Sequence, residues 1–103
     1  MNETDNLPRT LAALATALRE RRLSPVEVVG ALLERIEIVD KELNAFITVL
    51  PERAHEEAAR AEKEILDGEY RGPLHGVPVG LKDLIYTKGV RTTMGSAFFE
   101  DYV

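Results

Sequence analysis

Lys82 ends a segment in which apolar residues occur at every second position. These apolar residues are Val77, Val79 and Leu81. Alternation with a period of two is typical of a β-strand, and it places Gly80 and Lys82 together on the opposite face. Because Gly80 has no side chain, the amine of Lys82 would face a space that a ligand or another backbone can occupy. The alternative interpretation is a bulge at Gly80 and a hydrated lysine. The pattern predicts a strand over residues 76–82 and makes Lys82 the candidate functional side chain.

Two other patterns in the sequence fail to match a known site. His55 and His75 are the only histidines, and neither has a second imidazole or a carboxylate at a recognised metal-ligand spacing. Residues 76–82 lack the four-residue interval and the Gly-Lys-Ser/Thr ending with which a phosphate loop surrounds its ligand. The chain has no cysteine, which excludes a disulfide framework, a thiolate metal site and a cysteine nucleophile. We therefore predict no metal and no cofactor.

The composition is that of one small globular domain. The chain has 103 residues, of which 45% are hydrophobic and 30% are charged. Its 13 Lys and Arg residues against 18 Asp and Glu residues give a net charge of −5, which disfavours duplex DNA and anionic membranes as partners. The aliphatic runs are too short to span a membrane, and the polar start lacks the pattern of a secretory signal. These features predict a cytoplasmic protein that binds neither nucleic acid nor a membrane.

The sequence before residue 70 has apolar residues three and four positions apart, which predicts amphipathic helices. The predicted helices span residues 8–22, 25–42 and 51–67. Ser24 is the expected N-cap of the second helix, because Pro25 suits the first helical position and Glu27 can bond back to the serine N–H. The third helix carries mainly alanines on its apolar stripe, so a neighbouring helix can approach closely. The residues of this stripe are Ala54, Ala58, Ala61 and Ile65.

Residues 43–50 connect the second and third predicted helices. They include β-branched and aromatic side chains and precede Pro51, which disfavours a helical conformation in the residue before it. We expect an extended connection that buries Phe46. Beyond residue 70, glycines and prolines separate short apolar stretches, so the chain changes there from helices to turns and extended segments.

Two consecutive blocks of this second part, Gly72–Asp83 and Thr87–Ser96, resemble the amidase signature family. That family includes aliphatic and aryl amidases, fatty-acid amide hydrolases and the A subunit of the glutamyl-tRNA amidotransferases. The resemblance continues upstream and covers residues 10–103. The upstream segments are Leu23–Glu27, Leu33–Ile36 and Leu43–Phe46. An ordered match of this length is far more specific than any single short motif.

The resemblance implies a mixed α/β fold with a Ser–Ser–Lys catalytic triad, whose lysine corresponds to Lys82. In the family the two serines lie downstream, in a Gly- and Ser-rich stretch that this chain does not reach before Val103. We assign neither Ser24, the expected helix cap, nor Ser96, which in the family follows the catalytic strand, as the nucleophile. We treat Asp83 as structural. Residues 1–103 are then the N-terminal portion of one amidase-signature domain: three helices and the first strand or strands of a sheet that is truncated here.

The activity implied by the resemblance is hydrolysis of a carboxamide to a carboxylate and ammonia or an amine. A serine needs an adjacent base to attack a carbonyl, and a lysine provides one only when burial or nearby positive charge favours its neutral form. We expect this chain to be inactive alone, and its partners to be a small amide substrate and the missing C-terminal portion, or further copies of itself. The alternative function is a noncatalytic helical association module.

Overall fold

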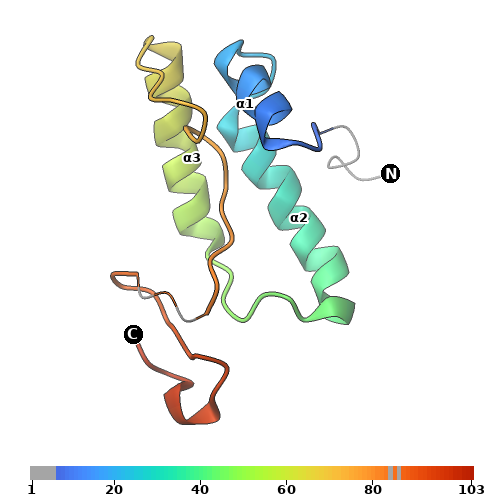
Figure 1. The fold of residues 1–103 in the computed structure, drawn as a ribbon, viewed down its shortest axis with the longest axis vertical. Coiled ribbons are helices and arrows are strands. Elements are labelled where there is room, and N and C mark those ends of the chain that lie inside the picture. The colour runs from blue at the N-terminus through green and yellow to red at the C-terminus, as the bar shows by residue number, and fades with distance from the viewer. Residues whose placement is uncertain (1–6, 84, 86) are drawn as a thin grey trace.

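The computed structural model describes residues 7–83, 85 and 87–103. The elements, in chain order, are α1 (Leu11–Arg19), α2 (Pro25–Leu43), α3 (Pro51–Leu66) and a short 3-10 helix, η2 (Ala97–Phe99). Figure 1 shows α2 and α3 side by side, with α1 at the end of the pair where α2 begins. Residues 77–103 run down past the opposite end of the pair. The prediction of three helices is confirmed.

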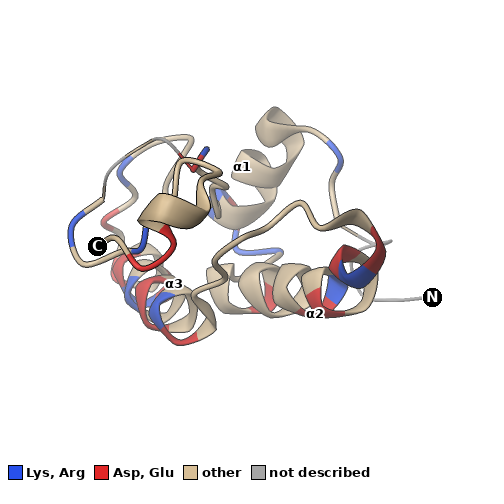
Figure 2. Ribbon diagram, turned by 90° about the horizontal axis from the view of Figure 1, so that it is seen from below, with Lys and Arg blue, Asp and Glu red and all other residues tan. Residues whose placement is uncertain are grey.

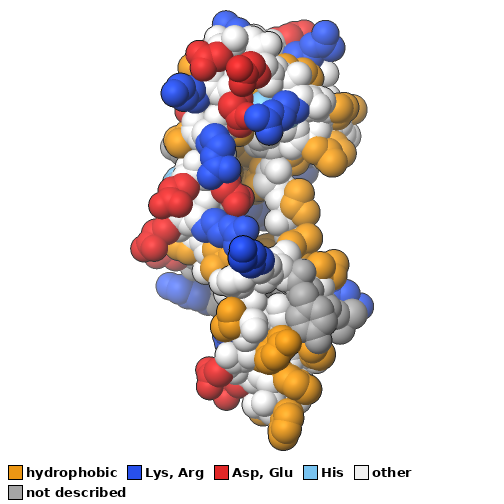
Figure 3. Space-filling view, turned by 90° about the vertical axis from the view of Figure 1, so that its left-hand side faces the viewer, with side chains coloured by type: hydrophobic (Ala, Val, Ile, Leu, Met, Phe, Trp, Pro, Cys, Tyr) orange, Lys and Arg blue, Asp and Glu red, His pale blue; other side chains and the backbone are white. Residues whose placement is uncertain are grey.

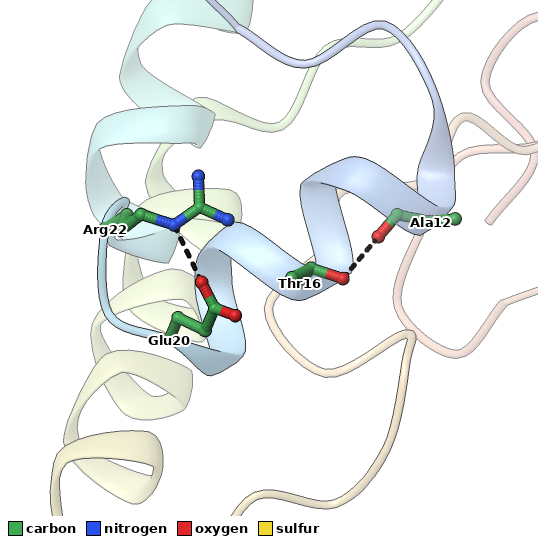
Figure 4. Close-up of polar contacts among 4 residues, drawn as sticks. All are labelled: Ala12, Thr16, Glu20 and Arg22. Atoms are coloured by element: carbon green, nitrogen blue, oxygen red, sulfur yellow. Dashed lines mark hydrogen bonds and ion pairs between the residues drawn. The ribbon is translucent and has the colours of Figure 1, made fainter.

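Helix α1 is shorter than the predicted range of 8–22 because its two ends are fixed by local structure. Thr10 is the N-cap, and its side-chain oxygen accepts a hydrogen bond of 3.1 Å from the N–H of Ala13. At the other end Arg21 adopts a left-handed φ of 62°, which ends the helix. Figure 4 shows the contacts within and after the helix: the Thr16 hydroxyl donates to the Ala12 carbonyl, and an exposed Glu20–Arg22 ion pair follows.

Helix α2 begins as the sequence predicts. The Ser24 hydroxyl oxygen accepts a hydrogen bond of 3.1 Å from the N–H of Glu27, and Pro25 follows in the first turn. Asn44 ends the helix in a left-handed conformation with φ 51°, and its N–H donates to the Asp40 carbonyl over 2.7 Å. Asp40 then caps the start of the connection, because one of its carboxylate oxygens accepts the N–H of Ala45 at 2.6 Å. Both ends of α2 are thus determined by residues next to it in the chain.

The core lies where the three helices meet. Helix α3 faces α2 with the predicted small residues, and Ala58, Ala61 and Ile65 are all buried. The remaining buried apolar residues come from α1 and from the first turns of α2. They are Ala15, Ala17, Leu18, Val28, Val29 and Ala31. The distant end of α2 has no such cover, and Leu43 is 68% exposed. Figure 2 shows residues of both charge signs along α2 and α3.

The structure does not show two features that the sequence predicts for the connecting segments. The strand over residues 76–82 does not form: residues 77–82 are an irregular segment, and the part of the chain that the structure describes contains no strand. A strand needs a neighbouring strand for its backbone hydrogen bonds, and an alternating sequence alone does not supply one. Phe46 is not buried either, since 43% of its surface is exposed.

Residues 87–103 form turns around two buried threonines, Thr92 and Thr93. The N–H of Thr92 donates to the Tyr102 carbonyl over 2.9 Å, which brings the end of the chain back to this point. The short helix η2 lies between Thr92 and Tyr102 in the sequence. Its aromatic residues Phe98 and Phe99 stack edge to face, with ring centroids 5.1 Å apart. This region is held by turns and side-chain hydrogen bonds, whereas residues 10–70 are held by packed helices.

Candidate active site

Lys82 lies at the end of an exposed segment. Its neighbours Val79 and Leu81 are 67% and 56% exposed, and Lys82 itself is exposed. A Cβ placed on Gly80 would lie 3.7 Å from Cε1 of Phe46, so the segment passes this ring in ordinary contact. One surface hollow of about 410 Å³ is lined by residues 97–102, and another of about 330 Å³ by residues 87–90 and 102–103. Neither lining includes Lys82. The described residues therefore do not enclose the lysine.

Asp83, the next residue, is firmly held by a turn ten residues further along the chain. Its carboxylate accepts the N–H of Thr93 at 2.8 Å, the hydroxyl of Thr93, and the N–H of Gly95 at 3.2 Å. Its carbonyl also accepts the N–H of Met94 at 2.9 Å. We call these four hydrogen bonds the Asp83 clamp. They support the structural role that the sequence analysis gives to Asp83.

The clamp favours the charged form of the carboxylate. The Thr93 hydroxyl bond, followed by the Thr93 N–H bond, lowers the pKa of Asp83 below its ordinary value of 3.8. Desolvation opposes this shift, while the Gly95 N–H and the positive charge of Arg91 add to it. Sequence reasoning missed the partners Thr93 and Gly95. The sequence marks a turn at Gly95, but no local spacing rule relates that turn to an aspartate twelve residues earlier.

The two serines present in the chain serve as caps. The Ser24 hydroxyl accepts the N–H of Glu27 at the start of α2, and the Ser96 hydroxyl accepts the N–H of Phe98 over 3.2 Å at the start of η2. Ser96 also donates its backbone N–H to the Thr93 carbonyl over 3.0 Å, so it belongs to the turn that holds Asp83. Neither hydroxyl is bonded to Lys82 within the described ranges, so the structure does not assemble a serine–lysine pair.

His75 anchors the segment at its other end. Its Nδ1 atom accepts the N–H of Arg71 over 3.1 Å, and its Nε2 atom lies 3.5 Å from Oε1 of Glu64 on α3. The side chains of His75 and Glu64 are only 9% and 16% exposed. The next residue, Gly76, has a φ of +84° and packs so closely that a Cβ would lie 2.7 Å from Cγ of Pro25. Residues 71–76 are therefore fixed to the start of α2 and the end of α3.

The described residues contain no group of three His, Asp or Glu side chains placed to hold a metal ion. His55 is exposed on α3, far in sequence from the His75–Glu64 pair. Among the helices of the described chain, none is both long enough and apolar enough to cross a membrane.

Comparison with known proteins finds relatives with similar sequences. The chain is 49% identical over 94 residues to the A subunit of the glutamyl-tRNA(Gln) amidotransferase of Geobacter sp. strain M21, covering 91% of this chain and 19% of that protein. The proteins of the same name from Dehalococcoides mccartyi strain CBDB1 and Methylococcus capsulatus strain Bath are 44% and 46% identical, over 97% and 92% of this chain. The chain spans about a fifth of the length of these relatives. No solved structure matches it.

The family-level comparison includes every residue of the candidate site. The family model described as Amidase matches residues 27–103, a range that contains His75, Lys82 and the Asp83 clamp. This match confirms the resemblance that the two blocks around Lys82 indicate, and with the identities to the amidotransferase A subunits it shows that the chain belongs to the amidase family.

Proposed function

We propose that residues 1–103 form the N-terminal part of an amidase-signature enzyme that hydrolyses carboxamides, with Lys82 as its catalytic base. The observation that carries the proposal is the position of Lys82. It lies within the matched range, and it is exposed next to a backbone that the Asp83 clamp holds fixed. A catalytic group needs a fixed backbone and a side chain that can still reach the reacting atoms.

The proposed reaction requires two serines from the part of the enzyme that this chain does not span. The neutral amine of Lys82 accepts the proton of a bridging serine, which in turn accepts the proton of the nucleophilic serine as its oxygen attacks the amide carbon. The C–N bond breaks, the departing nitrogen takes a proton, and water then hydrolyses the serine ester to the carboxylate. The exposed Lys82 needs further chain around it, because burial or a nearby positive charge must favour its neutral form.

Exposed apolar side chains support the view that further chain covers this side of the molecule. They occur on the connection before α3 and on the segment before Lys82. They include Ile47, Val79 and Leu81, at 51%, 67% and 56%. In Figure 3 a row of hydrophobic side chains follows the right-hand edge of the molecule down to its lower end. Apolar area of this kind is normally covered by another part of the protein or by a partner.

The names of the relatives narrow the choice of amide. They are A subunits of glutamyl-tRNA(Gln) amidotransferases, proteins whose name describes transfer of an amide group within an assembly of subunits. We propose that the enzyme completed from this chain releases ammonia from a carboxamide and works with other subunits. Glutamine and benzamide are suitable test substrates, because they separate an amidotransferase component from an amidase of broad specificity.

The test uses a completed enzyme in which residues 1–103 are joined to the downstream region of the Geobacter relative. We expect Lys82→Ala to lower ammonia release by a factor of about 10² to 10⁴, the usual cost of removing a general base. Lys82→Arg should fail equally, because arginine stays protonated. The matched control is Lys88→Ala, another exposed lysine, with activity within twofold of the unchanged enzyme.

The proposal is overturned if the arginine variant keeps activity within about threefold while the melting temperatures match. The 103-residue chain alone should release no ammonia above background. Turnover by this chain would return Ser96 to consideration as nucleophile. Activity in neither form, together with a stable homo-oligomer of the chain, would favour the alternative function as an association module.

A further inference from the structure

The segment that carries Lys82 is fixed at its two ends and free between them. Upstream, His75 and Gly76 pack against α2 and α3. Downstream, the Asp83 clamp begins directly after the lysine. Within the ranges that the structure describes, the N–H groups of residues 79–82 make no hydrogen bond. The backbone position of Lys82 therefore depends on the nearer of the two ends, which is Asp83.

We propose that Asp83 is a positioning residue for Lys82: its carboxylate, bonded to Thr93 and Gly95, fixes the point from which the lysine side chain extends toward the reaction. This inference rests on the proposed function, since it assigns Asp83 to the action of the same lysine. It goes beyond that function because it makes the turn at residues 92–95 part of the active site, although none of its side chains takes part in the chemistry.

The geometry of the clamp suits this role. Both carboxylate oxygens of Asp83 are used, and the donors are two backbone N–H groups and a hydroxyl from one turn. Hydrogen bonds to an ionised acceptor are shorter and stronger than neutral ones. The Asp83 carbonyl is held separately by Met94, and the Lys82 carbonyl accepts the N–H of Ile85 over 3.0 Å. The clamp thus holds the side chain and the main chain together.

Thr93 is well suited to hold Asp83 in one orientation. It is buried, with 4% of its surface exposed, and it uses both its N–H and its hydroxyl on the same carboxylate. The N–H of Gly95 also donates to the Thr93 hydroxyl oxygen over 3.3 Å, so the turn has an internal hydrogen bond in addition to its bonds to Asp83. A rotation of the Asp83 side chain would break three bonds at once. The lysine next to it therefore extends from a backbone with little freedom.

The first experiment measures the proposed restraint in the 103-residue chain. Asp83→Asn keeps an oxygen for the Thr93 N–H but replaces the oxygen that accepts from the Thr93 hydroxyl and the Gly95 N–H with an amide NH₂ group. The Gly95 N–H then keeps only its longer contact with the Thr93 hydroxyl oxygen. We expect the ¹⁵N order parameter of the Lys82 amide to fall to below about 0.6, the range of flexible backbone. The matched control is Asp101→Asn, a change at an exposed residue near the end of the chain, which should leave that order parameter unchanged. Equal order parameters for Lys82 in all three proteins would overturn the proposal.

The second experiment measures the consequence in the completed enzyme. We expect Asp83→Asn to lower kcat about 10- to 100-fold while KM stays within twofold, because the binding of the amide is not changed. Thr93→Val removes one donor of the clamp and should lower kcat less, and Thr93→Ser should restore it. A turn that matters only for folding predicts instead a lower melting temperature with kcat unchanged per folded enzyme, and this result would overturn the proposal. If Lys82→Ala has no effect on the rate, the proposed function fails, and the order parameters still test the restraint independently.

Discussion

The helical region, residues 10–76, and the region that follows, residues 77–103, are stabilised in different ways. In the first, buried side chains from three helices meet, and the ends of α1 and α2 are determined by residues next to them. In the second, hydrogen bonds of side chains to the backbone hold turns, and large apolar side chains such as Val79 and Phe98 stay exposed. The first region therefore has a packed core, although its far end leaves Leu43 and Ile47 exposed. In the described part of the second region only Thr92 and Thr93 are buried, and no such core forms.

The largest expected change in stability comes from comparing the replacement of one leucine in each region. Leu18 is fully buried among the helices, whereas Leu81 is 56% exposed. We expect Leu18→Ala to lower the free energy of unfolding by about 2–5 kcal/mol, because it leaves a cavity in the core. Leu81→Ala should change it by less than about 0.5 kcal/mol. Urea denaturation followed by circular dichroism measures both. Equal losses would mean that the second region shares the core, and the comparison would be wrong.

A second contrast concerns the point where the two regions join. Gly76 and Gly89 both have left-handed φ angles, of +84° and +74°, so alanine is strained by about 1–2 kcal/mol at either position. Only at Gly76 would the new Cβ meet a neighbour, at 2.7 Å from Cγ of Pro25, whereas at Gly89 nothing lies within 4 Å. We expect Gly76→Ala to be less stable than Gly89→Ala by about a further 1–3 kcal/mol, the usual cost of overpacking. Equal stabilities of the two variants would show that residues 71–76 are not fixed to the helices.

These contrasts explain which parts of the fold the sequence could predict. The start of α2 follows from Ser24 and Pro25, because a cap depends on residues that are neighbours in the chain. The end of α1 could not be predicted, because Arg21 takes the left-handed conformation usually left to glycine. The strand predicted at residues 76–82 is absent for a different reason. Its alternating pattern describes burial between partners that the described chain does not contain.

In the candidate site, too, the sequence could predict some residues and not others. The resemblance predicts Lys82 as the catalytic lysine, and in the described residues neither the Ser24 nor the Ser96 hydroxyl is bonded to it. The Asp83 clamp was missed because Thr93 and Gly95 are ten and twelve residues away, and no local spacing rule relates them to Asp83. Hydrogen bonds at such separation depend on how the intervening loop folds, which the pattern of residue types does not determine.

A smaller effect compares the two serine caps. Ser24 caps a helix of 19 residues, and Ser96 caps one of three. We expect Ser24→Ala to lower the free energy of unfolding by about 1 kcal/mol, the typical value of an N-cap in a long helix. Ser96→Ala should stay within about 0.5 kcal/mol of the unchanged protein, because its bond lies at the surface of the second region. Thermal and urea unfolding of the two variants measure these changes. A larger loss of unfolding free energy for Ser96→Ala than for Ser24→Ala would contradict the proposed difference between the regions.

The smallest expected effect is the response of the Asp83 clamp to acid. Its pKa in the folded chain lies below the ordinary value of 3.8, chiefly because of the Thr93 hydroxyl and N–H bonds, so the folded state favours the carboxylate. The clamp therefore contributes its full stability above about pH 4 and loses it as the pH falls through the lowered pKa. We expect the Thr93 amide resonance to shift as the pH falls, in a transition whose midpoint lies below 3.8. Asp83→Asn should show no such transition, which separates Asp83 from the other carboxylates. A transition of the Thr93 amide centred above 3.8 would mean that the clamp does not favour the charged form, and the second region would then lack the interaction that holds Lys82 in place.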